Sequence, residues 1–393
     1  MRIQSSPKIG RRAVAIAALS ALLLAACGAQ GQQSTRDAAT AKLRPAAATT
    51  TCTNKTKLAS WSTRRLALLT VAVPASETSV ASVQSEVSAG VGGVLLFGSK
   101  APLDLGAQLA ALQTHVPHDR GLLVMTDEEG GGVQRMANLV GSLPWAAWMG
   151  DNWTATQIRS HVGTVAKRMS AANVNMDLAP VVDVDGRNEP PSRYNPDGWR
   201  SFSGTTSVVT RDGLAYLKGL RDGHVIPVLK HFPGIGHSTY NSDDGTAYTL
   251  QWSTLKKVGL PPFTAGINAG APAIMVSNDI VRGLATNPGS ISPTTITYEL
   301  RGKLGFQGLV ITDSLTAKAI SNAGFTLSRA AVQALRSGAD MVTFSGTIDV
   351  GSRTTAIADA IVNAVVSGSL ARSRLIDAAA HVLGVRHINL CTG

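Results

Sequence analysis

Short apolar runs alternate with longer amphipathic stretches along most of the chain. Eight runs have the length of buried strands, and each is followed by enough residues for a helix. They span residues 66–73, 93–97, 122–126, 174–182, 225–229, 273–277, 309–312 and 340–344. Strands that are apolar on both faces are typical of parallel sheets covered by helices. The pattern therefore predicts an α/β fold, built either as a closed barrel or as an open doubly wound sheet.

Polar residues that follow the strands favour the barrel. The intervening segments 154–172 and 327–338 have helical spacing of their apolar residues. The residues just after the strands are chemically active types, namely Asp127, Asp177, Lys230, His231, Asn278, Asp313 and Ser345. Barrels assemble their active sites at the carboxyl ends of the strands. We therefore expect a single (β/α)8 TIM-type barrel with one site at that end.

The N-terminal segment reads as an export signal. Basic residues precede an apolar run over 13–26, which is too short to span a bilayer comfortably. Small residues before Cys27 resemble the bacterial lipobox, in which cleavage precedes a cysteine that is then lipidated. A plain secretory peptide cleaved nearby is the alternative, and the Arg11-Arg12 pair leaves the Sec and Tat export routes both open. We expect a signal peptide over 1–26 and a membrane anchor through lipid on Cys27 only.

The segment after Cys27 is rich in Ala, Thr, Gln and Ser and has no apolar periodicity. It predicts a low-complexity tether over 27–54 that leads to a barrel domain over 55–393. Loss of the signal peptide would lower the formal net charge from +11 to +7. No basic stripe is interleaved with aromatic residues, so we expect no nucleic-acid partner. Aromatic residues make up 5% of the chain, which favours a small pocket over a long carbohydrate platform, and we expect a monomer.

Two cysteines remain after the tether. Cys52 lies at the start of the folded part and Cys391 close to its end. A barrel brings its first and last units together, and the extracytoplasmic space is oxidising. We expect a disulfide between them, with two unpaired thiols as the alternative.

Four motifs carry a family resemblance. They are the runs at 127–135 (DEEGGGVQR), 177–184 (DLAPVVDV), 230–236 (KHFPGIG) and 308–315 (GLVITDSL). In this order they resemble glycoside hydrolase family 3, and most closely its single-domain bacterial β-N-acetylglucosaminidases, which include lipoproteins of cell-wall turnover. The resemblance implies retaining cleavage of a β-linked sugar without a metal or other cofactor.

The resemblance also assigns residues. Asp313 corresponds to the nucleophile that forms a glycosyl-enzyme. The positions that would hold the sugar are Asp127, Arg135, Arg200, Lys230 and His231. The implied substrate is a small carbohydrate or muropeptide outside the cytoplasmic membrane.

The sequence departs from the family at the acid/base. The family's N-acetylglucosaminidases carry Asp-Ser-His in the loop over 234–245, where this chain has Asn241, Ser242 and Asp243. Asp243 is our first candidate, because a carboxyl group with a raised pKa serves most glycosidases. The neighbouring Asp244 and the earlier His237 are alternatives.

Three functions stay open from the sequence. The first is an exo-acting β-N-acetylhexosaminidase on peptidoglycan-derived sugars. The second is a catalytically weak lipoprotein that binds sugars or muropeptides, which the missing dyad favours. The third is a Schiff-base aldolase with Lys230 as nucleophile, which leaves Asp313 and Arg135 without a role.

Overall fold

The structure of this protein is a computed structural model that describes residues 52–392. The expected signal peptide, the lipidation site Cys27 and nearly all of the expected tether lie outside these residues. The folded part opens with Thr53, whose hydroxyl accepts the amide hydrogen of Thr56 and so caps helix α1. Helix α1 (Asn54–Leu58) thus begins one residue before the expected start of the barrel domain.

Eight parallel strands form the central sheet. In chain order they are β1 (Val71–Ser76), β2 (Gly93–Phe97), β3 (Leu123–Thr126), β6 (Met176–Asp177), β7 (Ile226–Phe232), β8 (Ala273–Val276), β9 (Leu309–Thr312) and β10 (Val342–Thr343). Each strand pairs with the next one along the chain, and β10 pairs with β1. A parallel bridge between Ile311 and Met341 joins β9 to the start of β10. The sheet therefore closes on itself, and the expected (β/α)8 barrel is confirmed.

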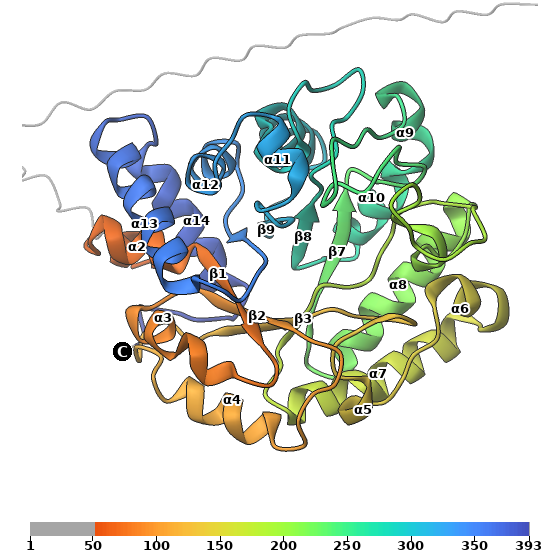
Figure 1. The fold of residues 1–393 in the computed structure, drawn as a ribbon, viewed down its shortest axis with the longest axis horizontal. Helices are drawn as coiled ribbons and strands as arrows, with labels where there is room; N and C mark the ends of the chain where they lie inside the picture. Colours follow the sequence, from red (N-terminus) through yellow and green to blue (C-terminus); the bar gives the residue numbers. More distant parts are fainter. Residues whose placement is uncertain (1–51, 393) are drawn as a thin grey trace, which may run out of the picture. The chain divides into compact units, whose positions relative to one another are not determined.

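Helices lie on the outside of the sheet (Figure 1). The longer ones are α4 (Leu105–Gln113), α7 (Ala155–Ala171), α8 (Thr206–Asp222), α10 (Leu260–Asn268), α12 (Leu327–Arg336), α13 (Val350–Val366) and α14 (Arg372–Gly384), with a π-helix over Thr294–Lys303. Shorter ones are α2 (Thr63–Leu69), α3 (Gln84–Ala89), α5 (Ala137–Val140), α6 (Ala146–Asn152), α9 (Trp252–Val258) and α11 (Lys318–Asn322), with 3-10 turns at Val80–Val83, Gly198–Arg200 and Gly289–Ile291. A two-stranded hairpin, β4 (Glu128–Gly130) with β5 (Val133–Gln134), follows β3.

Both helices that were expected from periodicity are present. Helix α7 begins after Thr154, which forms a capping box with Gln157, and its apolar stripe of Ile158, Val162 and Met169 is buried. Helix α12 begins after Thr326, whose hydroxyl accepts an amide hydrogen from the first turn. Local capping and a buried stripe act together here, which is why the sequence pattern is reliable.

Two strand predictions are wrong in their extent. Residues 66–69 belong to α2, which begins after the capping residue Ser62 and is buried like the strand that follows, so one apolar run covers a helix and a strand. The run 174–182 is strand only over Met176–Asp177. Pro180 lies a few residues beyond and has no amide hydrogen for strand pairing. Irregular backbone here leads the chain into the site.

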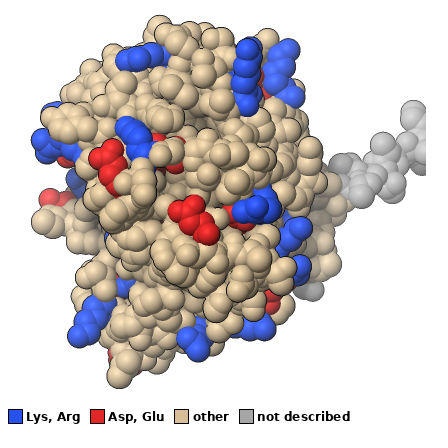
Figure 2. All heavy atoms as spheres, turned by 90° about the vertical axis from the view of Figure 1, so that its right-hand side faces the viewer, with Lys and Arg blue, Asp and Glu red and all other residues tan. Residues whose placement is uncertain are grey.

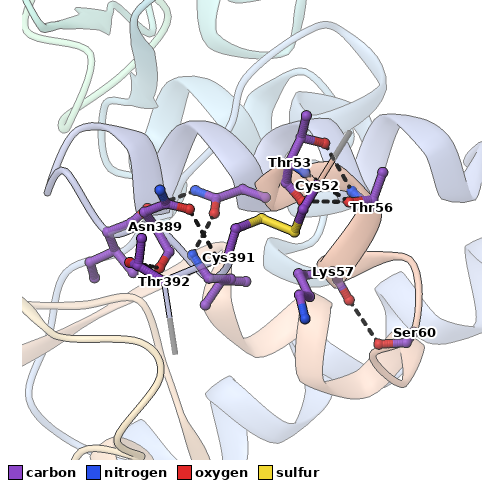
Figure 3. The surroundings of a disulfide bond; sticks show 11 residues. Cys52, Thr53, Thr56, Lys57, Ser60, Asn389, Cys391 and Thr392 are labelled. Carbon is purple, nitrogen blue, oxygen red and sulfur yellow. Dashed lines mark hydrogen bonds between the residues drawn. A yellow bond between two sulfur atoms is a disulfide. The ribbon is translucent and has the colours of Figure 1, made fainter. Parts of the chain in front are cut away.

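A disulfide links the two ends of the described chain. Cys52 and Cys391 are bonded, with their Cα atoms 5.9 Å apart (Figure 3). Asn54 adds a second tie in the same region: its amide donates to the Ile388 carbonyl and its carbonyl oxygen accepts from the Leu390 amide. The C-terminal segment is therefore held against α1.

Candidate functional site

A pocket of about 470 Å³ opens at the carboxyl ends of the strands. Its lining combines strand ends with loop residues, and the charged or polar members include Asp127, Glu129, Arg135, Arg193, Arg200, Lys230, His231, Asn241, Ser242, Asp243, Asp279, Asp313 and Ser345. Each of the seven residues expected to act in catalysis or sugar binding lies in this lining. Parallel closure of the barrel brings them together from positions far apart in the sequence.

Lys230 is the centre of an ionic cluster in the pocket. Its ammonium Nζ lies 2.7 Å from Oδ1 of Asp127 and 2.6 Å from Oε1 of Glu129. Arg200 pairs with the same Glu129 through two nitrogen–oxygen contacts of 2.8 Å. The Lys230 and Glu129 side chains are only 3% and 4% exposed. These charges are therefore held in fixed positions, as recognition of ring hydroxyls requires.

The cluster keeps its members ionised. Burial works against charge on Asp127, but Lys230 and Arg135 outweigh it and lower the pKa of that carboxyl. Burial likewise opposes the charge on Lys230, and the carboxylates of Asp127 and Glu129 outweigh it and raise the pKa of the amine. A protonated ammonium is a poor nucleophile, so the raised pKa of Lys230 argues against the aldolase hypothesis.

Arg135 is positioned by the β4–β5 hairpin. Its guanidinium lies 3.3 Å from Oδ2 of Asp127, while its backbone amide donates to the Glu128 carboxyl at 2.7 Å. Burial raises the pKa of Glu128 to about 7, against the lowering effect of its hydrogen bonds to Met136, Gln134 and Arg135. The hairpin needs Gly131, because φ there is +57° and an added Cβ would lie 2.0 Å from the Trp145 ring.

His231 is oriented by a carboxylate. Its Nδ1 lies 2.8 Å from Oδ2 of Asp183, which also accepts the backbone amide of His231, and Oδ1 accepts the Ile235 amide at 2.9 Å. The other ring nitrogen, Nε2, is 3.4 Å from Arg200. Asp183 therefore sets the orientation of the imidazole at the pocket wall.

Asp313 follows β9 directly and faces the pocket. Its backbone amide donates to the Val276 carbonyl, and its carboxylate Oδ1 accepts the Ser314 amide at 2.7 Å. No donor within residues 52–392 bonds the second oxygen, Oδ2. One carboxylate oxygen is thus held by the backbone while the other is available for reaction.

Asp243 lies in the loop over 234–245. The loop is tied to neighbouring elements by backbone bonds from Asn241 to the Arg193 carbonyl and from Ala319 to the Ser242 carbonyl. Burial around the carboxyl, followed by the charges of Asp313 and Asp244, raises the pKa of Asp243 to about 6, although the residue as a whole is exposed. This is the environment that a carboxyl proton donor needs.

The two alternative acid/base residues lie elsewhere. Asp244 pairs with Arg193 at 3.3 Å, and His237 is 47% exposed with its backbone amide bonded to Asp185. Neither belongs to the pocket lining. Gly236, just before His237, explains part of this, because an added Cβ would lie 2.0 Å from the Val184 carbonyl. The loop backbone therefore packs closely against the barrel at Gly236, and the His237 side chain is exposed to solvent.

Sequence reasoning missed three residues of the site. Glu129 binds both Lys230 and Arg200, Asp183 orients His231, and Asp279 lines the pocket. Each is an acidic residue close to a polar strand end, and that position was the available signal. Each is identified as a site residue only by its partner, which lies far away in the sequence. The separations are 71 residues for Glu129–Arg200, 48 for Asp183–His231 and 41 for Asp279–Ser238.

One group of side chains has the composition of a metal site. Single ligand atoms of Asp183, Asp197 and His231 lie within 4.8 Å of one another. Burial and the nearby charge of Asp183 raise the pKa of Asp197 well above its ordinary value, and its oxygens have no partner within residues 52–392. The Asp183 oxygens are already occupied by amide and imidazole donors. We assign no role in the reaction to this group of side chains.

One face of the molecule carries dispersed charge. Figure 2 shows this face, on which Lys and Arg side chains are scattered among neutral residues rather than gathered in a stripe. Concentrated charge is instead found inside the pocket. The distinctive chemistry of the described chain is therefore that of an enclosed small-molecule site.

Comparisons with known proteins agree with this geometry. Residues 65–385 match the family model described as the glycosyl hydrolase family 3 N terminal domain. A β-hexosaminidase of Mycobacterium tuberculosis, LpqI, is 33% identical over 263 residues, which is 64% of each of the two chains. A β-hexosaminidase of Xylella fastidiosa is 33% identical over 60% of this chain and 70% of its own.

Solved structures share the whole barrel. A family member from Mycobacterium smegmatis superposes with a TM-score of 0.75 at 31% identity, covering 84% of this chain and 98% of that one. M. tuberculosis LpqI superposes with a TM-score of 0.76 at 30% identity, covering 85% and 96%. The chain belongs to glycosyl hydrolase family 3, and residues 65–385 are its N terminal domain.

Proposed function

We propose that this protein is a retaining exo-β-glycosidase, specifically a β-N-acetylhexosaminidase that acts on peptidoglycan-derived sugars. The observation that carries the proposal is one pocket holding Asp313 and Asp243 beside the Lys230 cluster. Its relatives support the class of sugar, since the curated matches are named β-hexosaminidase. The pocket volume of about 470 Å³ suits a terminal sugar rather than a long chain.

In the first step, Asp313 attacks the anomeric carbon through its free Oδ2. The bond from that carbon to the leaving-group oxygen breaks, and protonated Asp243 donates its proton to this oxygen. The sugar ring has oxocarbenium-ion character in the transition state, and the Asp313 carboxylate beside it stabilises this positive charge. The products of the step are a glycosyl ester on Asp313 and a free alcohol.

In the second step, Asp243 is ionised and takes a proton from water. The water oxygen attacks the anomeric carbon and the ester bond to Asp313 breaks, which restores both carboxyl groups to their starting states. Asp127 accepts hydrogen bonds from sugar hydroxyls, and Lys230, Arg135 and Arg200 donate to their oxygens. Because these groups are already oriented by one another, little ordering is needed on binding.

We also propose that the protein acts outside the cytoplasmic membrane, held by lipid on Cys27. The support is the apolar run over 13–26 followed by small residues and a cysteine. Within residues 52–392, no helix has both the length and the apolar character to cross a bilayer. Metabolic labelling with a radioactive fatty acid would be lost in Cys27→Ser if the proposal holds.

Hydrolysis of two chromogenic substrates tests the activity. Wild type should release 4-nitrophenol from the β-N-acetylglucosaminide faster than from the β-glucoside. Asp313→Asn should abolish release from both, because the substituted amide cannot form the ester. Release that persists in Asp313→Asn would contradict the assignment of the nucleophile.

A weak sugar-binding protein is the second candidate. The replacement of the family's Asp-Ser-His by Asn241, Ser242 and Asp243 favours it. It predicts that wild type binds N-acetylglucosamine in calorimetry but releases no 4-nitrophenol. The two candidates therefore differ in turnover and agree in binding.

A further inference from the structure

Asp279 is a pocket residue that the mechanism above does not use. It lies just after β8, its side chain is 2% exposed, and it borders the same pocket as Asp313. Within residues 52–392 the one hydrogen-bonding partner of its carboxyl group is the Ser238 hydroxyl, with Oγ 2.5 Å from Oδ2. Ser238 belongs to the loop over 234–245, which carries Asp243 and is named the acid/base loop from here on.

The hydrogen count at Ser238 constrains the state of Asp279. The Ser238 Oγ also lies 3.0 Å from the Tyr240 carbonyl oxygen. A hydroxyl has one hydrogen, so it cannot donate to both acceptors at once. If Asp279 is neutral, its own hydrogen goes to Ser238, and the Ser238 hydrogen goes to Tyr240. If Asp279 is ionised, it competes with the Tyr240 carbonyl for that hydrogen.

The surroundings favour the neutral state. The charged groups that act most strongly on Asp279 are the carboxylates of Asp313 and Asp183. Burial is the main cause that raises the pKa of Asp279, to about 7. The Ser238 hydrogen bond acts against this rise, and the charges of Asp313 and Asp183 act in the same direction as burial. An ionised Asp279 would also place a second negative charge near the nucleophile.

The acid/base loop is otherwise fastened by backbone hydrogen bonds. In its middle the Asn241 amide donates to the Arg193 carbonyl, and the Ser242 and Asp243 carbonyls accept from amides of α11. At its start the Ile235 and His237 amides donate to Asp183 and Asp185. Just beyond its end, the backbone carbonyl of Ala247 accepts a hydrogen bond from the Ile280 amide at 2.9 Å. The Ser238–Asp279 bond is a side-chain tie between these anchors, and it links the loop to the end of β8. If this bond weakens, the first half of the loop, which leads to Asp243, is held less firmly.

We propose that Asp279 is a positioning residue: in its neutral form it donates to Ser238 and leaves the Ser238 hydrogen for the Tyr240 carbonyl, so that both bonds hold the acid/base loop, and it keeps extra negative charge away from Asp313. The proposal deepens the glycosidase function proposed above and rests on it for the catalytic consequence. The loop contact itself does not depend on activity. One measurement can therefore test the loop contact and another the catalytic consequence, so that a failure of one is distinguished from a failure of the other.

Hydrogen exchange of the loop amides tests the contact without substrate. In the full-length wild type, protection over 234–245 should fall about tenfold between roughly pH 6 and pH 8, after correction for intrinsic exchange rates. Asp279→Asn keeps a neutral donor toward Ser238 and should abolish this pH dependence. Ser238→Ala should give low protection at both pH values, while the exposed control Asp359→Asn should behave as wild type.

The pH dependence of kcat/KM tests the catalytic consequence. In wild type the alkaline limb should reflect loss of two protons, from Asp243 and Asp279, so its slope should be steeper than in Asp279→Asn. Asp279→Ala should lower kcat about 10- to 100-fold with a smaller change in KM, because the acid/base is displaced. Partial recovery of kcat in Asp279→Asn would distinguish positioning from general disruption.

Each possible outcome supports or refutes one part of the proposal. Equal pH dependence of loop exchange in wild type and Asp279→Asn would overturn the proposal, whatever the activity. A pH-dependent loop in a protein that turns over neither substrate would uphold the contact and refute the glycosidase assignment. Normal turnover with identical pH profiles in wild type and Asp279→Asn would refute the catalytic consequence.

Discussion

Arg200 and Glu129 form a two-pronged ion pair at the pocket wall, with both nitrogen–oxygen distances at 2.8 Å. Glu129 also lies 2.6 Å from the Lys230 ammonium, so one buried carboxylate holds two cations. The charges of Arg200 and Lys230 lower the pKa of Glu129 far enough, against the effect of burial, to keep it ionised. This shared carboxylate holds both cations in fixed positions at the pocket wall.

Removing the charge of Glu129 should therefore damage the fold and the binding site together. Glu129→Gln leaves two buried cations with less compensation, and we expect a loss of about 3–5 kcal/mol in the free energy of unfolding. Urea titration measures it, with Asp359→Asn as a surface control that should change stability by less than about 0.5 kcal/mol. A Glu129→Gln variant as stable as the control would show that the pairs contribute little.

Asp243→Asn should remove general acid catalysis. For a substrate with a poor leaving group we expect kcat to fall by about 10²- to 10⁴-fold, because the leaving oxygen departs unprotonated. An activated leaving group should lose less. Asp244→Asn and His237→Asn are matched controls, since both side chains lie outside the pocket. A larger loss in either control would reassign the acid/base.

The raised pKa of Asp243 predicts an alkaline decline in activity. The first step needs the protonated carboxyl, so kcat/KM should fall as the pH rises through about 6. The sign follows from the requirement for an acid: the active form is lost as protons leave. In Asp243→Asn the decline near pH 6 should disappear and only the shallower decline from Asp279 near pH 7 should remain, which initial rates at several pH values would reveal.

Asp177 should make folding less favourable as the pH rises. Its carboxyl is buried, and burial, opposed by the Glu128 amide and reinforced by the Glu128 charge, raises its pKa well above the ordinary value. The folded state then binds a proton that the unfolded chain releases above about pH 4, so stability declines by up to about 1.4 kcal/mol per pH unit over this window. Asp177→Asn should show a smaller decline in urea midpoints between about pH 5 and pH 8. Identical slopes would mean that Asp177 is ionised in the fold.

Loss of the disulfide should destabilise the barrel. Cys52 and Cys391 are 339 residues apart, so the bond restricts a very long loop in the unfolded chain. Cys52→Ser should lose about 2–4 kcal/mol in the free energy of unfolding. Wild type treated with reductant should match the variant. Equal stability with and without reductant would show that the bond adds nothing.

Several features could be predicted from local sequence because local interactions set them. Helix α7 combines a capping box at Thr154 with an apolar stripe, and the strands are apolar on both faces. Where two elements share one apolar run, as at α2 and β1, the pattern cannot separate them. A buried helix turn and a buried strand expose the same residue types to the core.

By itself the sequence determined the alternation that closes into a barrel, the polar strand ends, and the motifs that assign Asp313. Only the tertiary structure decided which polar side chains meet: Glu129 with Arg200, Asp183 with His231, and Asp279 with Ser238. It also placed Asp243 in the pocket lining and its alternatives, Asp244 and His237, outside it. The reason is that periodicity arises within one helix or strand, whereas charge pairing, burial and pKa depend on distances that exist only after the barrel has closed.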